Sequence, residues 1–340
     1  MSQSDDHDFA QTDAAHRAPV RRQFHSTDAP LIVTPTLVSR VDSTPWSERP
    51  HDAGSSVDRS GREVEHPDQH ADRLGLEPNK NVAFEHWDEY WRKVHGPKFA
   101  YNEPGSTSEL VLRYDQLHRI ASGPSSQFRP PYRAMTDEHG RLLEDPSAHV
   151  PSYGRPRWDG LAYIAYGSTE DIGRTLEQEK FAKRIIADEQ TAFRVVTRGI
   201  AREHIIIPSA LHRDAVSLVK IHVRRPEHTR ESFQQWWLNA HVDAVLSKPA
   251  THTHVRRYAQ LHTIGSTQDD PEGEVIDGIS VLSFASLNDV EDYLSTADYR
   301  EIEQHEHEAC SDAGEFWTAL NYSVINRLAP ELATARNTVR

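Results

Sequence analysis

Residues 113–118 read Arg-Tyr-Asp-Gln-Leu-His, and residues 257–262 read Arg-Tyr-Ala-Gln-Leu-His, so one motif recurs at an offset of 144 residues. A second motif, aromatic-Trp-x-x-x-His, precedes each copy, as Tyr90–His95 and as Trp236–His241. Because the two motifs keep their order, the chain contains an internal repeat.

A third motif, Asp-Gly before an apolar run, begins at Asp159 and again at Asp277, an offset of 118. The change from 144 to 118 means that the first copy carries about 26 extra residues after its His118. We expect this proline-rich insertion, at about 121–157, to be either a lid or a partner surface. A second insertion, at about 41–80, has prolines that break regular structure.

Hydrophobic periodicity predicts the order strand, helix, strand, strand, helix, strand in each copy. The expected elements of the first copy are 31–38, 85–94, 110–120, 161–166, 170–192 and 195–207. Those of the second are 215–223, 230–244, 255–264, 276–284, 287–313 and 316–325. The sequence therefore predicts an α+β protein, with two ferredoxin-like βαββαβ units in tandem whose sheets cover each other.

The predicted units span 30–208 and 214–328, with a disordered tail at 1–29 and a C-terminal tail at 329–340.

The counts of 38 Lys+Arg and 52 Asp+Glu give a net charge of −14, which argues against nucleic-acid binding. No apolar run approaches the roughly 18–20 residues of a membrane span, and the acidic start lacks the pattern of a secretory signal, so we expect a cytoplasmic protein. Since Cys310 is the only cysteine, an intrachain disulfide and a cysteine-based metal site are excluded.

Together these motifs resemble the EthD family of the dimeric α/β-barrel superfamily. The resemblance rests on aromatic-Trp-x-x-x-His, Arg-Tyr, Asp-Gly and a late Asp before an aromatic residue, at Asp188 and Phe193 and again at Asp312 and Phe316. It covers about 82–207 and 215–327, and it implies an intramolecular α/β barrel. Members of the superfamily include cofactor-free cyclases, dehydratases, decarboxylases and monooxygenases, and also haem enzymes.

His95 and His241 are the leading catalytic candidates, because each follows a Trp by one helical turn and can titrate near neutral pH. The alternative is that each caps its helix C-terminus. His241 is the preferred candidate, because its copy departs less from the family pattern.

The repeated strand supplies further candidates. Alternation places Tyr114 and His118 on one face of the first copy and Arg113 on the other. That polar face either lines a cavity or forms the contact between the two sheets. The remaining candidates come from the second copy and from the two helix tryptophans: for catalysis Tyr258 and His222, and for substrate binding Arg257, His262, Trp237 and Trp91.

Two histidine-rich runs, His252-Thr-His254 and Glu303 to Glu308, resemble metal sites in composition. We expect His252 and His254 to lie on one face of a strand. Neither run provides three convergent ligands, so no metal is expected. Haem stays open as an alternative, because one helix histidine and an apolar pocket can hold it.

The sequence predicts an EthD-like enzyme that acts on a small hydrophobic, aromatic or polyketide-like molecule by cofactor-free acid–base chemistry, as a dehydratase, decarboxylase or cyclase. Two alternatives remain: an oxidoreductase or haem-dependent lyase of the same superfamily, and a non-catalytic ligand-binding protein. The expected partner is a small molecule, without nucleic acid or membrane, and a homo-oligomer stays open.

Overall fold

The structure is a computed structural model that describes residues 30–40, 87–100, 107–120, 123–126, 128–130, 139, 141, 157–209, 214–265 and 276–328. The predicted N-terminal tail, the insertion at 41–80, most of the insertion at 121–157 and the C-terminal tail lie outside these residues. The described start of the insertion at 121–157 packs on the C-terminal half, where Ser125 bridges to Trp317.

Eight antiparallel strands form a closed barrel in the order β3-β2-β9-β6-β8-β7-β5-β1, with β1 pairing back to β3. They are β1 (Ile32–Arg40), β2 (Arg113–Arg119), β3 (Gly160–Tyr166), β5 (Ala201–Ile207), β6 (Val216–His222), β7 (Arg257–Thr263), β8 (Gly278–Phe284) and β9 (Phe316–Asn326). A ninth strand, β4 (Phe193–Arg198), pairs with β1. Closure leaves no long unpaired edge among the eight.

The two halves of the chain are joined by two strand pairs, β2 with β9 and β5 with β7. The predicted single strand 195–207 is instead two strands, interrupted at Gly199 and Ile200. The pairing shifts there from β1 to β7, although β5 keeps a short pairing with β1 at Ala201 and Arg202. Strand β9 makes the same change without a break, pairing first with β6 and then with β2.

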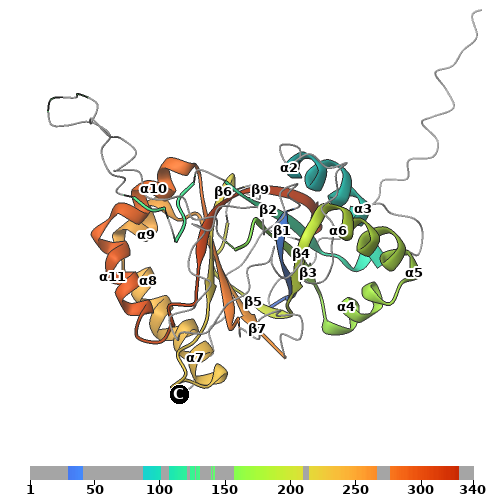
Figure 1. The fold of residues 1–340 in the computed structure, drawn as a ribbon. Coiled ribbons are helices and arrows are strands. Elements are labelled where there is room, and N and C mark those ends of the chain that lie inside the picture. The colour runs from blue at the N-terminus through green and yellow to red at the C-terminus, as the bar shows by residue number, and fades with distance from the viewer. Residues whose placement is uncertain are drawn as a thin grey trace, which may run out of the picture.

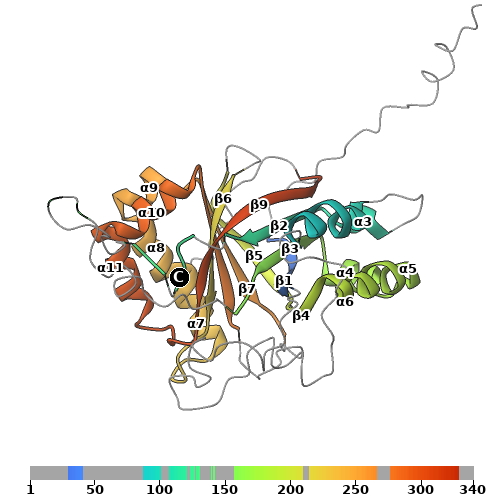
Figure 2. The same cartoon turned by 45° about the horizontal axis from the view of Figure 1, so that its top comes forward.

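Helices cover the outside of the barrel on two opposite sides, one set for each half (Figure 1; Figure 2). The first set is α2 (Trp87–Tyr90), η3 (Trp91–His95), α3 (Gly96–Ala100), η4 (Thr107–Leu110), α4 (Thr169–Leu176), α5 (Glu179–Phe181), η6 (Ala182–Ile186) and α6 (Ala187–Ala192). The second is α7 (Arg230–Trp236), η7 (Trp237–His241), α8 (Val242–Leu246), α9 (Pro249–His254), α10 (Leu287–Ser295) and α11 (Ala297–Glu306). Among the described residues no helix is both long and apolar enough to cross a membrane.

Three helix predictions need correction. The expected helix 170–192 is interrupted at Glu177 and Gln178, between α4 and α5. The expected single helix 287–313 is divided, because the Thr296 side chain accepts a hydrogen bond from the Tyr299 N–H and starts α11 afresh. His252 and His254 lie on the short helix α9, which begins at Pro249, and not on one face of a strand.

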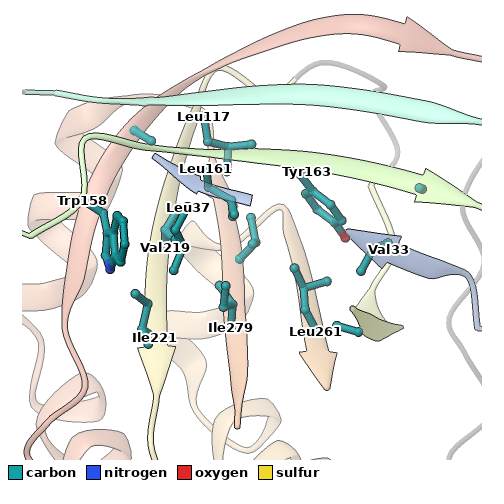
Figure 3. Packing of buried hydrophobic residues seen from close by; sticks show 14 of the residues in the cluster. Val33, Leu37, Leu117, Trp158, Leu161, Tyr163, Val219, Ile221, Leu261 and Ile279 are labelled. Carbon is teal, nitrogen blue, oxygen red and sulfur yellow. The ribbon is translucent and has the colours of Figure 1, made fainter. Parts of the chain in front are cut away.

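The barrel interior is filled by apolar side chains from both halves, among them Leu117, Leu161, Val219, Leu261 and Ile279 (Figure 3). Their neighbours along the strands point outward to the helices, as the alternation predicts.

The Asp-Gly motifs are explained by the packing of the helix tryptophans. A Cβ on Gly160 would lie 2.5 Å from the Trp91 ring, and one on Gly278 would lie 2.2 Å from the Trp237 ring. Each glycine therefore lets a helix tryptophan lie directly against the sheet.

Candidate functional site

A cavity of about 410 Å³ lies in the N-terminal half, between the outer face of the barrel and the covering helices. Strands β1, β2 and β3 supply one wall through Thr36, Tyr114 and Ala162. Most of the remaining lining is apolar or aromatic: Trp91, Phe99, Phe181, Phe193, Ile164 and Ile172. A space of this size and lining suits a small, largely apolar molecule.

One titratable pair stands in this apolar lining. The Nδ1 atom of His95 lies 2.7 Å from Oδ2 of Asp188, and both side chains are buried. The Tyr90 hydroxyl donates to Oδ1 of Asp188 at 2.5 Å, and the Lys98 ammonium is paired with the same oxygen. Three donors thus converge on one carboxylate.

These contacts keep the Asp188 carboxyl ionised. Burial opposes ionisation of Asp188, but the hydrogen bonds from His95, Lys98 and Tyr90 outweigh it and hold the pKa of that carboxyl well below its usual range. Because an ionised carboxylate only accepts hydrogen bonds, Nδ1 of His95 donates to it and Nε2 is the ring nitrogen that faces away from Asp188. His95 lines the cavity, and the described residues give Nε2 no hydrogen-bond partner.

Tyr114 provides a hydrogen-bond donor on the same cavity. Its oxygen accepts a hydrogen bond from Nε2 of Gln116 at 2.9 Å, and the same nitrogen donates to the Trp91 carbonyl at 3.0 Å. Burial raises the pKa of the Tyr114 phenol, so the group stays protonated. Its own proton is therefore available for an oxygen in the cavity.

Both halves contribute to the rim of the cavity. Leu176 and Ile200 come from the first half and are unusually exposed for large apolar residues, at 46% and 39%. Ile264 and Gly265 come from the second half. An ion pair between Arg198 and Glu189 lies beside them. The rim therefore presents an apolar entrance with one neutralised charge pair.

The equivalent region of the second half is filled. Nζ of Lys220 lies 2.6 Å from Oε1 of Glu306 and 3.3 Å from the Tyr299 hydroxyl. His241 is stacked on Trp236, with its Nδ1 3.3 Å from Nδ1 of His305. Burial, followed by the charges of Lys220 and His305, lowers the pKa of His241 to about 3, so this ring is neutral.

The partner of the second helix histidine is not the residue that the sequence motif suggests. The motif makes Asp312 the counterpart of Asp188, because both precede an aromatic residue. In the structure Oδ1 of Asp312 lies 3.7 Å from Nδ1 of His307. The residues that contact His241 are His305 and Glu306. The connection between the last helix and the last strand differs between the halves, so counting back from the aromatic residue misaligns them.

The other polar residues of the repeated strands form hydrogen-bond chains behind the tryptophans. His118 stacks on Trp91 and His262 on Trp237, with ring centroids 4.0 and 4.5 Å apart. Nε2 of His262 lies 2.9 Å from Oε1 of Gln260, whose amide donates to the Tyr258 hydroxyl at 2.7 Å.

Burial governs the titration of this second-half cluster. It raises the pKa of Tyr258 to about 12 and lowers that of His222 to about 3. Nε2 of His222 lies 2.9 Å from the Ser280 hydroxyl, so this ring is already engaged. The candidates Tyr258, His222, His262 and Trp237 thus form a packed cluster.

Arg113 and Arg257 point to the opposite side of the sheet, into the barrel.

Asp188, Lys98 and Thr36 were not among the predicted site residues, although Asp188 belonged to the motif behind the family resemblance. The described residues contain no group of three or more His, Cys, Asp or Glu side chains placed to hold a metal ion.

Comparison with known proteins supports the resemblance found in the sequence. Residues 225–312 match the EthD domain family. No curated protein sequence matches the chain. The first similar solved structure is an anthrone oxidase-like protein, with a TM-score of 0.46, 13% identity, and coverage of 90% of this chain and 98% of that one.

Two further solved structures are similar to the chain at lower TM-scores. One is a putative monooxygenase from Lactobacillus acidophilus NCFM, with a TM-score of 0.37, 9% identity, and coverage of 89% of this chain and 99% of that one. The other is a mutant chlorite dismutase from Candidatus Nitrospira defluvii, with a TM-score of 0.36, 10% identity, and coverage of 86% and 91%.

Proposed function

We propose that this chain, whose residues 225–312 match the EthD domain family, is an enzyme that acts on a small aromatic or polyketide-like molecule by acid–base chemistry. The observation that carries the proposal is the buried His95 and Asp188 pair on an otherwise apolar cavity. The geometry favours His95 over His241, because His241 is packed against Trp236, His305 and Glu306.

In the proposed reaction, Nε2 of His95 removes a proton from the carbon next to a carbonyl group. The imidazolium that forms is stabilised by Asp188, which holds the ring through Nδ1. The Tyr114 hydroxyl donates to the enolate oxygen as charge develops there. His95 then returns its proton to a leaving hydroxide, which departs as water, or to carbon after ring closure.

The proposal includes the origin of the fold. We infer that the barrel is two ferredoxin-like units in tandem, about 30–208 and 214–328, packed as the two subunits of a dimeric α/β barrel would be. The same element order in both halves and the equivalent cross-half pairs support this. The first unit keeps the cavity and the second serves as scaffold and rim. A cytoplasmic location and a homo-oligomeric assembly stay predictions.

A haem-dependent lyase or oxidoreductase is the second candidate, and the same pair supports it. Metal-ligating histidines commonly donate their other ring N–H to a carboxylate, as His95 does to Asp188. His95 would hold the haem, which would supply one-electron and oxygen chemistry. An absorption spectrum of the purified protein separates the candidates: a Soret band supports haem, and a colourless sample supports acid–base chemistry or ligand binding.

Occupation of the cavity is tested with 2-tetralone, a flat neutral ketone with exchangeable protons next to its carbonyl. The Ala162→Phe variant places a ring in the cavity, whereas Ala162→Ser copies Ser280, the residue at the equivalent place on β8. We expect calorimetry to show binding to the wild type and to Ala162→Ser, and a loss of about tenfold or more in Ala162→Phe. Equal binding by all three proteins would contradict the site.

Ligand binding without turnover is the third candidate, and the histidine distinguishes it. A protein that only binds should tolerate His95→Gln with little change in its effect on the ligand, whereas an enzyme should lose the reaction and keep the affinity.

A further inference from the structure

A second and larger cavity, of about 660 Å³, lies at one end of the barrel interior. It is separated from the His95 cavity by the sheet, because Arg113 and Tyr114 are neighbours on β2 and therefore point to opposite faces. Tyr114 lines the first cavity and Arg113 the second. We call this second cavity the barrel chamber.

Two buried guanidinium groups stand on its wall. Arg113 and Arg257, from equivalent places in the repeated motif, are only 6% and 7% exposed. Nη2 of Arg113 lies 2.5 Å from Oε1 of Glu203, and Nη2 of Arg257 lies 3.0 Å from the same oxygen. The Tyr163 hydroxyl donates to this oxygen as well. One buried carboxylate therefore serves two buried arginines.

The register of the sheet shows why the cavity lies where it does. Glu203 faces Leu261 on β7, and its equivalent, Asn321 on β9, faces Leu117 on β2. Tyr163 faces Asp115, and its equivalent, Val281, faces Ala259. The first half thus supplies a glutamate and a tyrosine, whereas the second half supplies an asparagine and a valine. Asn321 and Val281 both line the barrel chamber, and so do both arginines.

The second half also makes this end of the barrel polar. Ser217 and Ser283 face each other across β6 and β8, with their hydroxyl oxygens 3.0 Å apart. The equivalent pair in the first half is Val33 and Ala165. Nδ2 of Asn321 donates to the Ser217 hydroxyl at 2.8 Å.

Several charges surround the chamber. Arg92 and the two buried arginines line it, as do Asp115 and Asp214. Oδ2 of Asp115 lies 3.2 Å from Nε of Arg113, and its side chain is partly exposed. Ala259 follows Arg257 by two positions, as Asp115 follows Arg113. The second copy of the motif therefore supplies no such carboxylate. The lining of the chamber therefore carries three arginines and two aspartates, and Glu203 lies behind it, paired with both buried arginines.

We propose that the barrel chamber binds the carboxylate of a small organic acid, at the place that is related to Glu203 by the internal repeat. The carboxylate accepts hydrogen bonds from both guanidinium groups, as the Glu203 carboxylate does on the other side. The apolar part of the acid packs on Val281, Leu117 and Leu328. This site is separate from the proposed catalytic site and does not depend on it.

The test is calorimetric titration with benzoate and with benzamide, its neutral relative, at pH 7. We expect benzoate to bind with one site per chain and benzamide to bind at least about tenfold more weakly, since hydrogen bonds to a charged acceptor are the stronger ones. Val281→Tyr gives the second half the tyrosine that the first half already holds at the equivalent place, and should abolish benzoate binding. Val281→Ile is the matched control and should keep it.

Arg257→Gln provides a second variant, in which the charge is removed without filling the cavity, and benzoate binding should fall by a similar factor. Thermal melting of each variant shows whether it is folded. The proposal is overturned if benzoate and benzamide bind alike. It is also overturned if benzoate survives Val281→Tyr but is lost in Ala162→Phe, because that result places the acid in the His95 cavity.

Discussion

Thr36 and Lys220 occupy equivalent positions on β1 and β6, each two residues before the residue that faces the glycine of an Asp-Gly motif. Thr36 lines the open cavity of the first half. Lys220 extends into the corresponding space of the second half and pairs with Glu306. One exchange of side chain at this position thus accompanies the difference between a cavity and a filled core.

Thr36→Lys is therefore expected to close the first cavity. The lysine would lie among aromatic residues, and its ammonium would pair with Glu189 or Asp188, as the ammonium of Lys220 pairs with Glu306. Binding of 2-tetralone, followed by calorimetry, should fall by about tenfold or more. Thr36→Val has nearly the same size as threonine and should bind normally, and equal affinity in both variants would contradict the assignment.

The buried pair in the second half should behave as a structural unit. Lys220→Met leaves Glu306 buried without its cation, which typically costs about 3–5 kcal/mol. The double variant Lys220→Met with Glu306→Gln removes both charges and should recover most of that loss. Urea unfolding of the two single variants and the double variant measures the coupling energy between the two side chains. Strictly additive losses of stability would show that the two side chains are not coupled.

The Asp-Gly glycines should tolerate no side chain. Gly278→Ala places a methyl group 2.2 Å from the Trp237 ring, and overpacking of this kind costs about 1–3 kcal/mol. Gly173→Ala on helix α4 is the matched control, because no atom beyond its chain neighbours and its own helix backbone lies within 4 Å of the added carbon. That change should stabilise the protein by about 0.5–1 kcal/mol. Thermal melting that ranks the two variants in the reverse order would contradict the packing described here.

Stability should fall as the solution becomes acidic. The folded pKa values of His222 and His241 are about 3, below the ordinary value of about 6.5, so the unfolded chain takes up protons first. Their contribution to stability is present above pH 6.5 and is lost as the pH falls toward 3, at up to about 2.7 kcal/mol per pH unit for the two rings. Urea midpoints at pH 7.5, 6.5 and 5.5 measure this loss.

His222→Gln removes one of these rings, and the slope should drop by up to about 1.4 kcal/mol per pH unit. A stability that stays constant between pH 7.5 and 5.5 would show that these rings do not titrate as described.

The repeated motifs predicted the order of strands and helices because each motif reports a local contact. Asp-Gly marks the place where a helix tryptophan lies on the sheet, and the alternation in the Arg-Tyr strand separates Arg113 from Tyr114. The separation of Arg113 from Tyr114 could be predicted from the alternation alone, whereas the contact of each glycine with its tryptophan is visible only in the structure.

The asymmetry of the two halves could not be predicted in that way. Asp188 lies 93 positions from His95 in the chain, and the equivalent contact of His241 is made by His305. Glu203 stands between Arg202 and His204 on its strand, and nothing in its spacing indicates that it joins Arg113 and Arg257. Which half keeps a cavity depends on such pairings between distant segments.

Asp188 is expected to act through the tautomer of His95. In Asp188→Asn the amide can donate to Nδ1, which would leave the proton on Nε2 and remove the base. The rate of proton abstraction should fall by about 10²–10⁴-fold, while the affinity for 2-tetralone changes little. Loss of affinity and rate together would indicate a merely structural role.

The most direct test of the account is the exchange of the protons next to the carbonyl of 2-tetralone for deuterium, followed by NMR in D₂O with the wild type, His95→Gln and His241→Gln. We expect the wild type and His241→Gln to accelerate the exchange above the buffer rate. His95→Gln should lose about 10²-fold or more of that acceleration while it still binds the ketone. Exchange that survives in His95→Gln and disappears in His241→Gln would contradict the assignment of the first-half cavity as the catalytic site.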